Sequence, residues 1–388
     1  MTQVHFTLSQ EEIQSFIEQS ISDQFAQSVL TKVFNQLMEH QRDEYIGAKP
    51  YERLGDRKSN RNGYYERDYT TRVGTLTLRV PRTRDGQFSP DVFSRYQRHE
   101  KSLLASMLEM YVQGVSTRKV GHIVEELCGK RPSKSFVSSL TKELDEEVKR
   151  WQYAPLNSHS YPYLIVDVVY IKVREDHRVL SKSCHVAIGI NEEGNREVLG
   201  LLILGGESFE TWTRFFDYLK QRGLSGVKLV ISDAHKGLVK AIRATFTDVS
   251  WQRCQVHFMR NIFQYTPKKD AQSFKEKVKS IFQFTNIEDA RKSKDQLLDE
   301  FSEQGPYRKA CEILDEGFED AFQYIAVGPA HRRVRTSNAI ERLNEEIRRR
   351  EKVVRIFPNV ASANRLIGSI LMDTNDEWIA SSRTYIKL

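Results

Sequence analysis

Three acidic residues lie where the surrounding sequence makes a carboxylate costly or conspicuous. Asp167 is in the middle of the apolar run 164–171, where an ionised carboxylate is expensive to bury unless it is paired or binds a metal. Asp233 directly follows the predicted strand 227–232, at a strand-to-helix turn. Glu341 lies beside the apolar stripe of a predicted helix. Each also has a structural explanation: an edge strand, a helix N-cap and a favourable helix-dipole interaction, respectively.

In combination, the three acids indicate metal-dependent phosphoryl transfer. Two carboxylates from neighbouring strands and one from a later helix can hold two divalent ions. Two ions about 4 Å apart stabilise both the attacking and the leaving oxygen of an in-line displacement. Oxygen ligands favour Mg²⁺ or Mn²⁺. We therefore expect Asp167, Asp233 and Glu341 to be catalytic residues and ligands of two Mg²⁺ (or Mn²⁺) ions per active site.

The elements that must position these acids follow the pattern of an α/β domain. The sequence predicts strands and helices in the order β-β-β-α-β-α-β, at 163–173, 184–190, 197–204, 209–222, 227–232, 236–246 and 249–252. A meander of three strands followed by alternating units predicts a mixed sheet flanked by helices. Acids on the first and fourth strands match the ribonuclease-H-like fold. Residues 258–327 are predicted to be wholly helical and would interrupt this domain.

The N-terminal part of the chain is predicted to be mostly helical. Residues 9–46 carry apolar side chains at helical spacing, and 99–150 outlines three helices separated by short turns. That outline is typical of helix-turn-helix DNA-binding units, although plain helical bundles share it. Residues 60–68 are interpreted as a turn-rich basic stretch and 70–82 as a short hairpin. The expected N-caps within 99–150 are Ser116 and Ser133.

Positive charge is concentrated in two segments of the chain. The 388 residues carry a net charge of +7, with an isoelectric point near 9.0. Residues 51–84 and residues 332–355 each hold nine basic and four acidic side chains. Such blocks are typical of a polyanion partner, but two solvated faces would show the same balance.

The composition argues against a membrane or a disulfide-linked protein. The longest apolar runs, such as 199–204, are far shorter than the roughly 20 residues of a membrane span. The first dozen residues show no signal-peptide pattern. Four scattered cysteines form no Cys-x-x-Cys pair, which fits a reducing cytosol. We expect a cytoplasmic protein with no membrane partner.

Ordered motifs give the chain a resemblance to a known family. The first acid ends the stretch YPYLIVD (161–167), the second lies in SDAHKGL (232–238), and the third lies in TSNAIERLN (336–344). Shorter matching stretches are GVSTR (114–118), VAIG (186–189), EVLG (197–200), QRCQVHFMRN (252–261) and FP (357–358). From about residue 50 onward, the chain resembles DDE transposases of bacterial insertion sequences, in the branch related to the Mutator transposases.

The resemblance implies a function, a triad and partners. The protein would bind the terminal inverted repeats of its insertion sequence, nick a strand at each end, and join the 3′-hydroxyl to target DNA. Asp167, Asp233 and Glu341 would be the DDE triad. Its partners would be double-stranded DNA, in the terminal repeats and the target, and a second copy in a homodimer on DNA. The expected location is the bacterial cytoplasm, in association with the nucleoid. Two alternatives remain: another ribonuclease-H-like nuclease, or a non-catalytic regulator derived from a transposase.

Cys254-x-x-His257 belongs to the same family pattern. Two ligands do not make a zinc site, which takes four. Either the pair is a packed cysteine with a hydrogen-bonded histidine, or Cys254 and His257 support the active site, with His257 near the scissile phosphate or bracing an acid. Other side chains are expected to contact DNA: Arg118, Lys119, Arg260, Asn261, Arg332, Arg333, Arg348, Arg349, Arg350 and Lys352.

These predictions divide the chain into six parts. The N-terminal parts are a helical region for dimerisation or DNA binding, a small basic β-containing DNA-binding region, and a helix-turn-helix-like domain, at 1–50, 51–98 and 99–150. The C-terminal parts are the first part of the catalytic domain, the helical insertion, and the last part with the third acid, at 158–258, 259–330 and 331–388.

Overall fold

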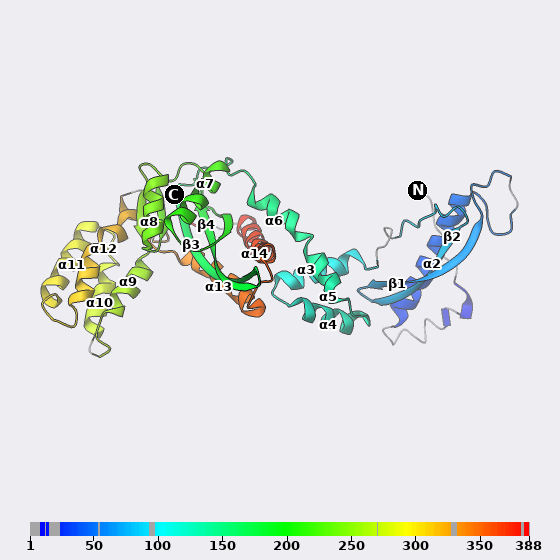
Figure 1. Ribbon diagram of the computed structural model, residues 1–388, viewed down its shortest axis with the longest axis horizontal. Coiled ribbons are helices and arrows are strands. Elements are labelled where there is room, and N and C mark those ends of the chain that lie inside the picture. Colours follow the sequence, from blue (N-terminus) through cyan, green and yellow to red (C-terminus); the bar gives the residue numbers. More distant parts are fainter. Residues whose placement is uncertain are drawn as a thin grey trace. The chain divides into compact units, whose positions relative to one another are not determined.

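The computed structural model describes residues 8–11, 13–14, 24–52, 55–92, 98–269, 271–326, 332–381 and 384–387. The chain divides into two compact units, residues 1–142 and residues 143–388 (Figure 1). Of the helix expected at 9–46, α2 (Gln24–Ile46) is present, and positions 12 and 15–23 of that prediction lie outside the described residues. None of the helices in the described ranges is long and apolar enough to span a bilayer.

A long β-hairpin packs against α2 in the first unit. Strands β1 (Arg61–Thr71) and β2 (Gly74–Thr83) pair antiparallel. The hairpin turns at Gly74, whose φ of +127° suits glycine. Apolar residues alternate along β2 and bury one face of the hairpin against α2. The buried core of this layer consists of Met38, Tyr69, Leu76, Leu78 and Val80.

The interpretation of residues 60–68 as a turn-rich stretch was wrong, because most of it forms β1. The register of the hairpin shifts between Arg61 and Tyr64, and Gly63 within that shift has a φ of +67°. The Asn62-Gly63 pair therefore makes an irregularity inside a strand. Pairing with β2, whose apolar face is fixed on α2, outweighs the local preference for a turn.

Three short helices complete the first unit: α3 (Lys101–Val112), α4 (Thr117–Cys128) and α5 (Lys134–Thr141). The predicted N-caps are confirmed, since the hydroxyl of Ser116 accepts from the amide of Lys119 and that of Ser133 accepts from the amide of Phe136. Gly129 ends α4 with a φ of +70°. A small core holds the three helices together, formed by Leu103, Met107, Val120, Val124, Cys128, Val137 and Leu140.

The last predicted helix of 99–150 is two helices that belong to different units. After α5 ends at Thr141, a separate helix α6 (Leu144–Gln152) begins the second unit. The α6 helix packs on α14 (Val360–Ala380) near the C-terminus. Arg365 donates two hydrogen bonds to the Asp145 carboxylate, at 2.7 and 2.8 Å. The expectation of a single last helix after the Ser133 N-cap was therefore wrong.

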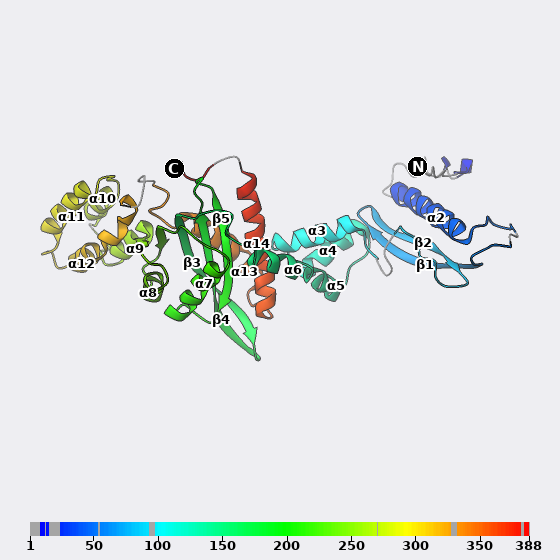
Figure 2. The same ribbon diagram turned by 90° about the horizontal axis from the view of Figure 1, so that it is seen from above.

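A five-stranded mixed sheet forms the centre of the second unit, with the order β5-β4-β3-β6-β7. Figure 2 shows β3, β4 and β5 of this sheet. Its strands are β3 (Tyr163–Glu175), β4 (Arg178–Ile190), β5 (Arg196–Leu204), β6 (Leu229–Ser232) and β7 (Ser250–Arg253). The first three make an antiparallel meander. β6 then pairs in parallel with β3, and β7 pairs in parallel with β6. The predicted mixed sheet flanked by helices is confirmed.

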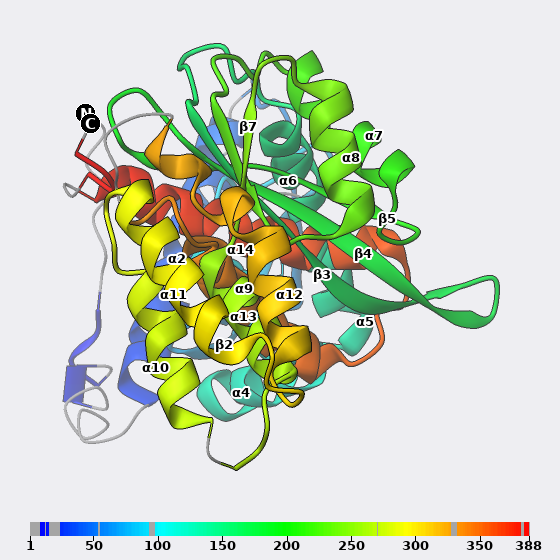
Figure 3. The same cartoon turned by 90° about the vertical axis from the view of Figure 1, so that its left-hand side faces the viewer.

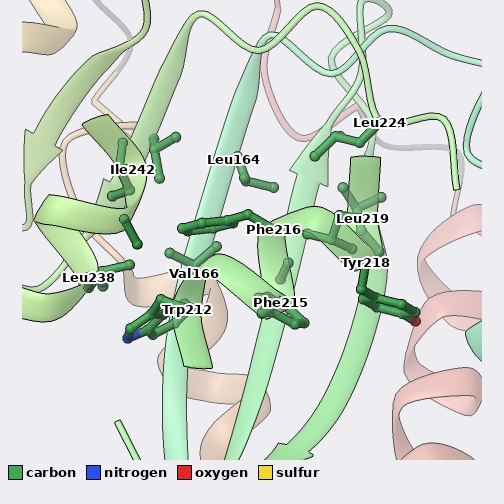
Figure 4. Packing of buried hydrophobic residues seen from close by; sticks show 14 of the residues in the cluster. Leu164, Val166, Trp212, Phe215, Phe216, Tyr218, Leu219, Leu224, Leu238 and Ile242 are labelled. Atoms are coloured by element: carbon green, nitrogen blue, oxygen red, sulfur yellow. The ribbon is translucent and has the colours of Figure 1, made fainter. Parts of the chain in front are cut away.

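Helices cover both faces of the sheet (Figure 3). α7 (Phe209–Gln221) and α8 (Lys236–Thr245) pack on one face, where Trp212, Phe215 and Phe216 lie against Leu164 and Val166 of β3 (Figure 4). α13 (Asn338–Val354) and α14 pack on the other, along β3 and β5. Because side chains alternate along a strand, residues 165, 167 and 169 of β3 face α13.

A helical segment separates β7 from α13, as the sequence predicted. It contains α9 (Gln255–Gln264), α10 (Gln272–Ile281), α11 (Ile287–Phe301), α12 (Arg308–Gly317) and two short 3₁₀ turns, η1 (Glu319–Ala321) and η2 (Gln323–Ile325). The end of this segment is fixed both to β7 and to the start of the segment. The side-chain amides of Gln252 on β7 and Gln255 on α9 both donate to the Ala321 carbonyl. The insertion therefore returns the chain to the edge of the sheet from which it left.

Candidate active site

Strand register brings the first two acids together. In the parallel pair of β3 and β6, Ile165 lies opposite Ile231. Asp167 and Asp233 each follow two residues later, so continuing the register sets them side by side where β6 ends. Carboxyl ends of parallel strands are the usual place for ligands in such sheets. The sequence alone could not give this register, since β6 has only four residues.

Asp167 is held in place by two hydrogen bonds. Its Oδ1 accepts from the amide of Val168 at 2.8 Å, and its Oδ2 accepts from the side-chain amide of Asn344 at 2.7 Å. Burial raises the pKa of Asp167 to about 6, against the lowering effect of the Val168 hydrogen bond, and the negative charge of Asp233 adds to the rise. The side chain is therefore a half-buried carboxyl whose ionisation is costly without a nearby cation.

Glu341 reaches the same edge from α13. It lies in the first turn of that helix, one turn before Asn344, so both side chains are on the face towards β3. Ser337, the N-cap residue, donates from its hydroxyl to Glu341 Oε1 at 3.4 Å. The third acid thus arrives on the same helix as Asn344, which contacts Asp167, although more than one hundred residues separate it from Asp233 in the chain.

His257 links the second and third acids. It lies in the first turn of α9, with Nδ1 against Asp233 Oδ1 and Nε2 3.3 Å from Glu341 Oε1. Hydrogen bonding with Asp233 raises the pKa of His257 to about 10, helped by Cys254 and opposed by burial. The imidazolium is therefore placed to offset the mutual repulsion of two carboxylates.

Cys254 connects the start of α9 to the start of α13, next to the site. Its fully buried sulfur accepts from the hydroxyl of Ser337 at 3.1 Å and from the amide of Ser337 at 3.4 Å. Burial would raise the pKa of Cys254, but hydrogen bonds with His257 and Ser337 outweigh it, so the pKa is lowered. The Cys254 amide also donates to the Ser232 carbonyl at 2.8 Å, next to Asp233.

The arrangement has the donors that a divalent cation needs. Three carboxylates converge on one edge of the sheet. Within the described residues, Asn344 Oδ1 is a buried oxygen without a hydrogen-bond donor, and Asp233 Oδ1 is a buried oxygen that faces the His257 imidazole. Oxygen-rich sites of this kind suit Mg²⁺ or Mn²⁺. The residues present therefore fit the metal expected from the sequence, and Asp167, Asp233 and Glu341 could hold it.

Glu207 is a fourth acid that the sequence analysis missed. It lies in the loop between β5 and α7, and its negative charge contributes to the raised pKa of Asp167. Its Oε1 accepts from the indole of Trp212 at 3.1 Å and lies 3.4 Å from His235 Nδ1. Its Oε2 accepts from the Tyr170 hydroxyl at 3.5 Å. Because its partners come from separate segments, no local pattern marks it.

The basic side chains expected to contact DNA lie in several places. Arg118 and Lys119 are exposed in the first turn of α4, in the first unit. In the second unit, exposed side chains are Arg260 on α9, Arg332 and Arg333 before α13, and Arg348, Arg349 and Lys352 on α13, while Asn261 is half-buried. Arg350 departs from the expectation, because it is buried and ion-paired with Glu346. Arg349 pairs with the same carboxylate at 3.0 Å.

Comparison with known proteins decides the family. The sequence model of the Mutator family of transposases matches residues 1–381. The chain belongs to this family. The resemblance found in the motifs is therefore confirmed, and it extends to the N-terminal helical region as well as the motifs around the three acids.

Named relatives match this transposase over nearly its whole length. The transposase for insertion sequence element IS256 in transposon Tn4001 of Staphylococcus aureus is 66% identical over 386 residues, covering 100% of this chain and 99% of the relative. The transposase for ISRM5 of Rhizobium meliloti is 40% identical, covering 93% and 90%. The transposase for IS1081 of Mycobacterium tuberculosis is 38% identical, covering 94% and 90%.

Proposed function

We propose that this transposase nicks DNA at the terminal inverted repeats of its insertion sequence and joins the resulting 3′-hydroxyl to target DNA. The observation that carries the proposal is the meeting of Asp167, Asp233 and Glu341 at one edge of the sheet, with His257 between the last two. The strand order β5-β4-β3-β6-β7, with a three-strand meander and two parallel strands, supports a ribonuclease-H-like catalytic domain.

In this proposal the three carboxylates hold two Mg²⁺ or Mn²⁺ ions. When bound, the ions would activate the attacking water or 3′-hydroxyl and stabilise the charge on the phosphate oxygens. The protein's own side chains position the carboxylates and offset their charge. Asn344 and the Val168 amide orient Asp167. His257 holds Asp233 and Glu341 close together despite their like charge. No covalent protein intermediate is needed, so no serine or tyrosine nucleophile is required.

DNA recognition is assigned mainly to the first unit. The three-helix cluster α3–α5, with exposed Arg118 and Lys119, supports a helix-turn-helix that reads the terminal repeats. Exposed basic side chains around Glu341 would seat phosphates beside the catalytic acids. Since two DNA ends must be handled together, the active species is proposed to be a homodimer on DNA.

The decisive experiment is a nicking and strand-transfer assay with element-end DNA in Mg²⁺. Asp167→Asn and Glu341→Gln should abolish both reactions, because a neutral amide cannot offset metal charge. End binding should be retained or improved, since repulsion between the carboxylates is relieved. The exposed neighbour Glu345→Gln is the matched control and should react like the parent. Near-parental nicking by Asp167→Asn or Glu341→Gln would contradict the mechanism.

The same assay separates the alternative functions. Cleavage without joining of ends to target DNA would indicate a nuclease rather than a transposase. Specific end binding without cleavage by the parent protein would indicate a regulator.

A further inference from the structure

A soft-metal ligand set lies at the edge of the proposed active site. Asp233, Cys254 and His257 offer one ligand atom each, and these three atoms lie within 4.8 Å of one another. Cys254 and His257 are three residues apart, so the first turn of α9 presents both on one face. Asp233 comes from the end of β6. The sequence alone gave two of the four ligands of a zinc site, Cys254 and His257. The structure adds Asp233 as a third.

The surroundings of the sulfur favour a thiolate ligand. Cys254 is fully buried, and both the hydroxyl and the amide of Ser337 donate to its sulfur. Donors around a cysteine sulfur stabilise the thiolate, which is the form that binds metals. Asp233 Oδ1 and His257 Nδ1 are buried and form an ion pair with each other. An ion that bound both atoms would replace this contact and keep both side chains in place.

The chemistry of this set differs from that of the three carboxylates. Mg²⁺ takes oxygen ligands and does not favour thiolate. A thiolate, an imidazole and one carboxylate select Zn²⁺ and similar thiophilic ions. Three protein ligands with an open fourth position are sufficient for a zinc ion that also binds water.

We propose that Asp233, Cys254 and His257 bind Zn²⁺, and that this ion excludes the catalytic metal from Asp233 and so inhibits the transposase. The inhibitory part rests on the proposed function, because it requires Asp233 to be a catalytic metal ligand. The binding part requires only that the three side chains take the ion. Zinc binding displaces the proton from the His257 nitrogen that binds the ion and the proton of the Cys254 thiol, releases both to solvent, and leaves the oxidation state of the sulfur unchanged.

The binding part is tested with Co²⁺, which replaces zinc and absorbs light. Full-length transposase without added metal is titrated with Co²⁺, and the sulfur-to-cobalt charge-transfer absorption in the near ultraviolet is recorded. We expect a saturating band at one Co²⁺ per chain that Zn²⁺ displaces. Cys254→Ser should lose the band. Cys311→Ser, which removes another buried thiol on α12, is the matched control and should keep it.

His257→Ala provides a second variant in case Cys254→Ser does not fold, as judged by circular dichroism. It should weaken Co²⁺ binding by at least about tenfold, a scale on which even outer-shell partners change metal affinity. Absence of the band in the parent, or a band of parental strength in folded Cys254→Ser, would overturn the proposal.

The inhibitory part is tested by nicking at fixed Mg²⁺ with increasing Zn²⁺. Cys254→Ser should need at least about tenfold more Zn²⁺ for half-inhibition than Cys311→Ser. Equal sensitivity of the two variants would overturn the inhibitory part. If the parent shows no Mg²⁺-dependent nicking, the proposed function fails, and the cobalt titration still decides whether the ion binds.

Discussion

At the scale of single residues, Asp167 has the most constrained environment of the three acids. Its carboxyl is half-buried on β3, close to the charge of Asp233, and its pKa is raised from an ordinary value of 3.8 to about 6. The folded protein thus binds the Asp167 proton more tightly than the unfolded chain does. Stability from this group is fully present below about pH 4 and is lost as pH rises through about 6.

Asp167→Asn should therefore stabilise the protein in the absence of divalent metal. At pH 8 the gain should be up to about 3 kcal/mol, since each pKa unit corresponds to about 1.4 kcal/mol. Near pH 4 the gain should disappear. Urea unfolding with a chelator at pH 4, 6 and 8 measures the effect, and Glu345→Gln is the control. A gain that stayed constant across this range would show that ionisation of Asp167 is not its cause.

Asn344 is predicted to be a positioning residue. It donates to Asp167 from α13, the helix that carries Glu341, and it is almost fully buried. Asn344→Ala should reduce nicking by about 10- to 100-fold, as loss of an outer-shell partner does. The Mn²⁺ concentration for half-maximal nicking should rise, while affinity for end DNA should not change. Glu345→Ala is the control. An unchanged Mn²⁺ requirement would assign Asn344 a purely structural role.

Particular residues show which parts of the candidate site could be predicted from the sequence and which could not. Asp167 was predictable because it interrupts an apolar run, and the meeting of His257 with the acids was left as one of two possibilities. Glu207 and the Ser337–Cys254 contact were not predictable, since each depends on how distant segments pack. The three acids were named from sequence, but the contacts that hold them came only from the structure.

At the scale of elements, the core of the second unit depends on α7. Trp212 is fully buried against β3, and its ring stacks on Phe216 with centroids 5.6 Å apart. Trp212→Ala should lower the free energy of unfolding by about 3–5 kcal/mol, because it removes a large buried side chain and leaves a cavity. Chemical denaturation measures this. Trp378→Ala, at a half-buried tryptophan on α14, should cost less, and an equal loss for both would contradict the packing argument.

Elements with strong internal patterns were predicted well, and those fixed by partners were not. Apolar runs predicted β3, β5 and β6, and serine N-caps predicted the starts of α4 and α5. β1 was missed because its strand character comes from β2 rather than from its own residues. The break between α5 and α6 was missed because the spacing of apolar residues in the sequence does not change between the two helices. The break exists because the two helices pack in different units.

At the scale of the whole molecule, the two compact units indicate where the chain can be divided. Residues 143–150 pack on α14, so a cut after 142 preserves the second unit, whereas the predicted boundary at 150 removes most of α6. The finer division into six parts remains a prediction.

Removal of residues 1–142 should abolish selection of the terminal repeats. The remaining fragment 143–388 should stay folded, since it keeps its own sheet and core. Competition binding between element ends and random duplex measures selection. Affinity of the full chain should fall steeply with salt, because each neutralised phosphate releases counterions. If the fragment 143–388 still prefers its own ends, recognition does not belong to the first unit.

The late position of α13 has a consequence for how the protein is synthesised. The first unit, β3 and β6 all precede the helical insertion, and Glu341 is translated after them. A chain whose translation stops within the insertion would carry the proposed DNA-reading region and two acids but no third. Such a truncated product would occupy element ends without cutting them. Premature termination would thus yield a competitor of the complete enzyme, so the gene's own translation errors would restrain movement of the element.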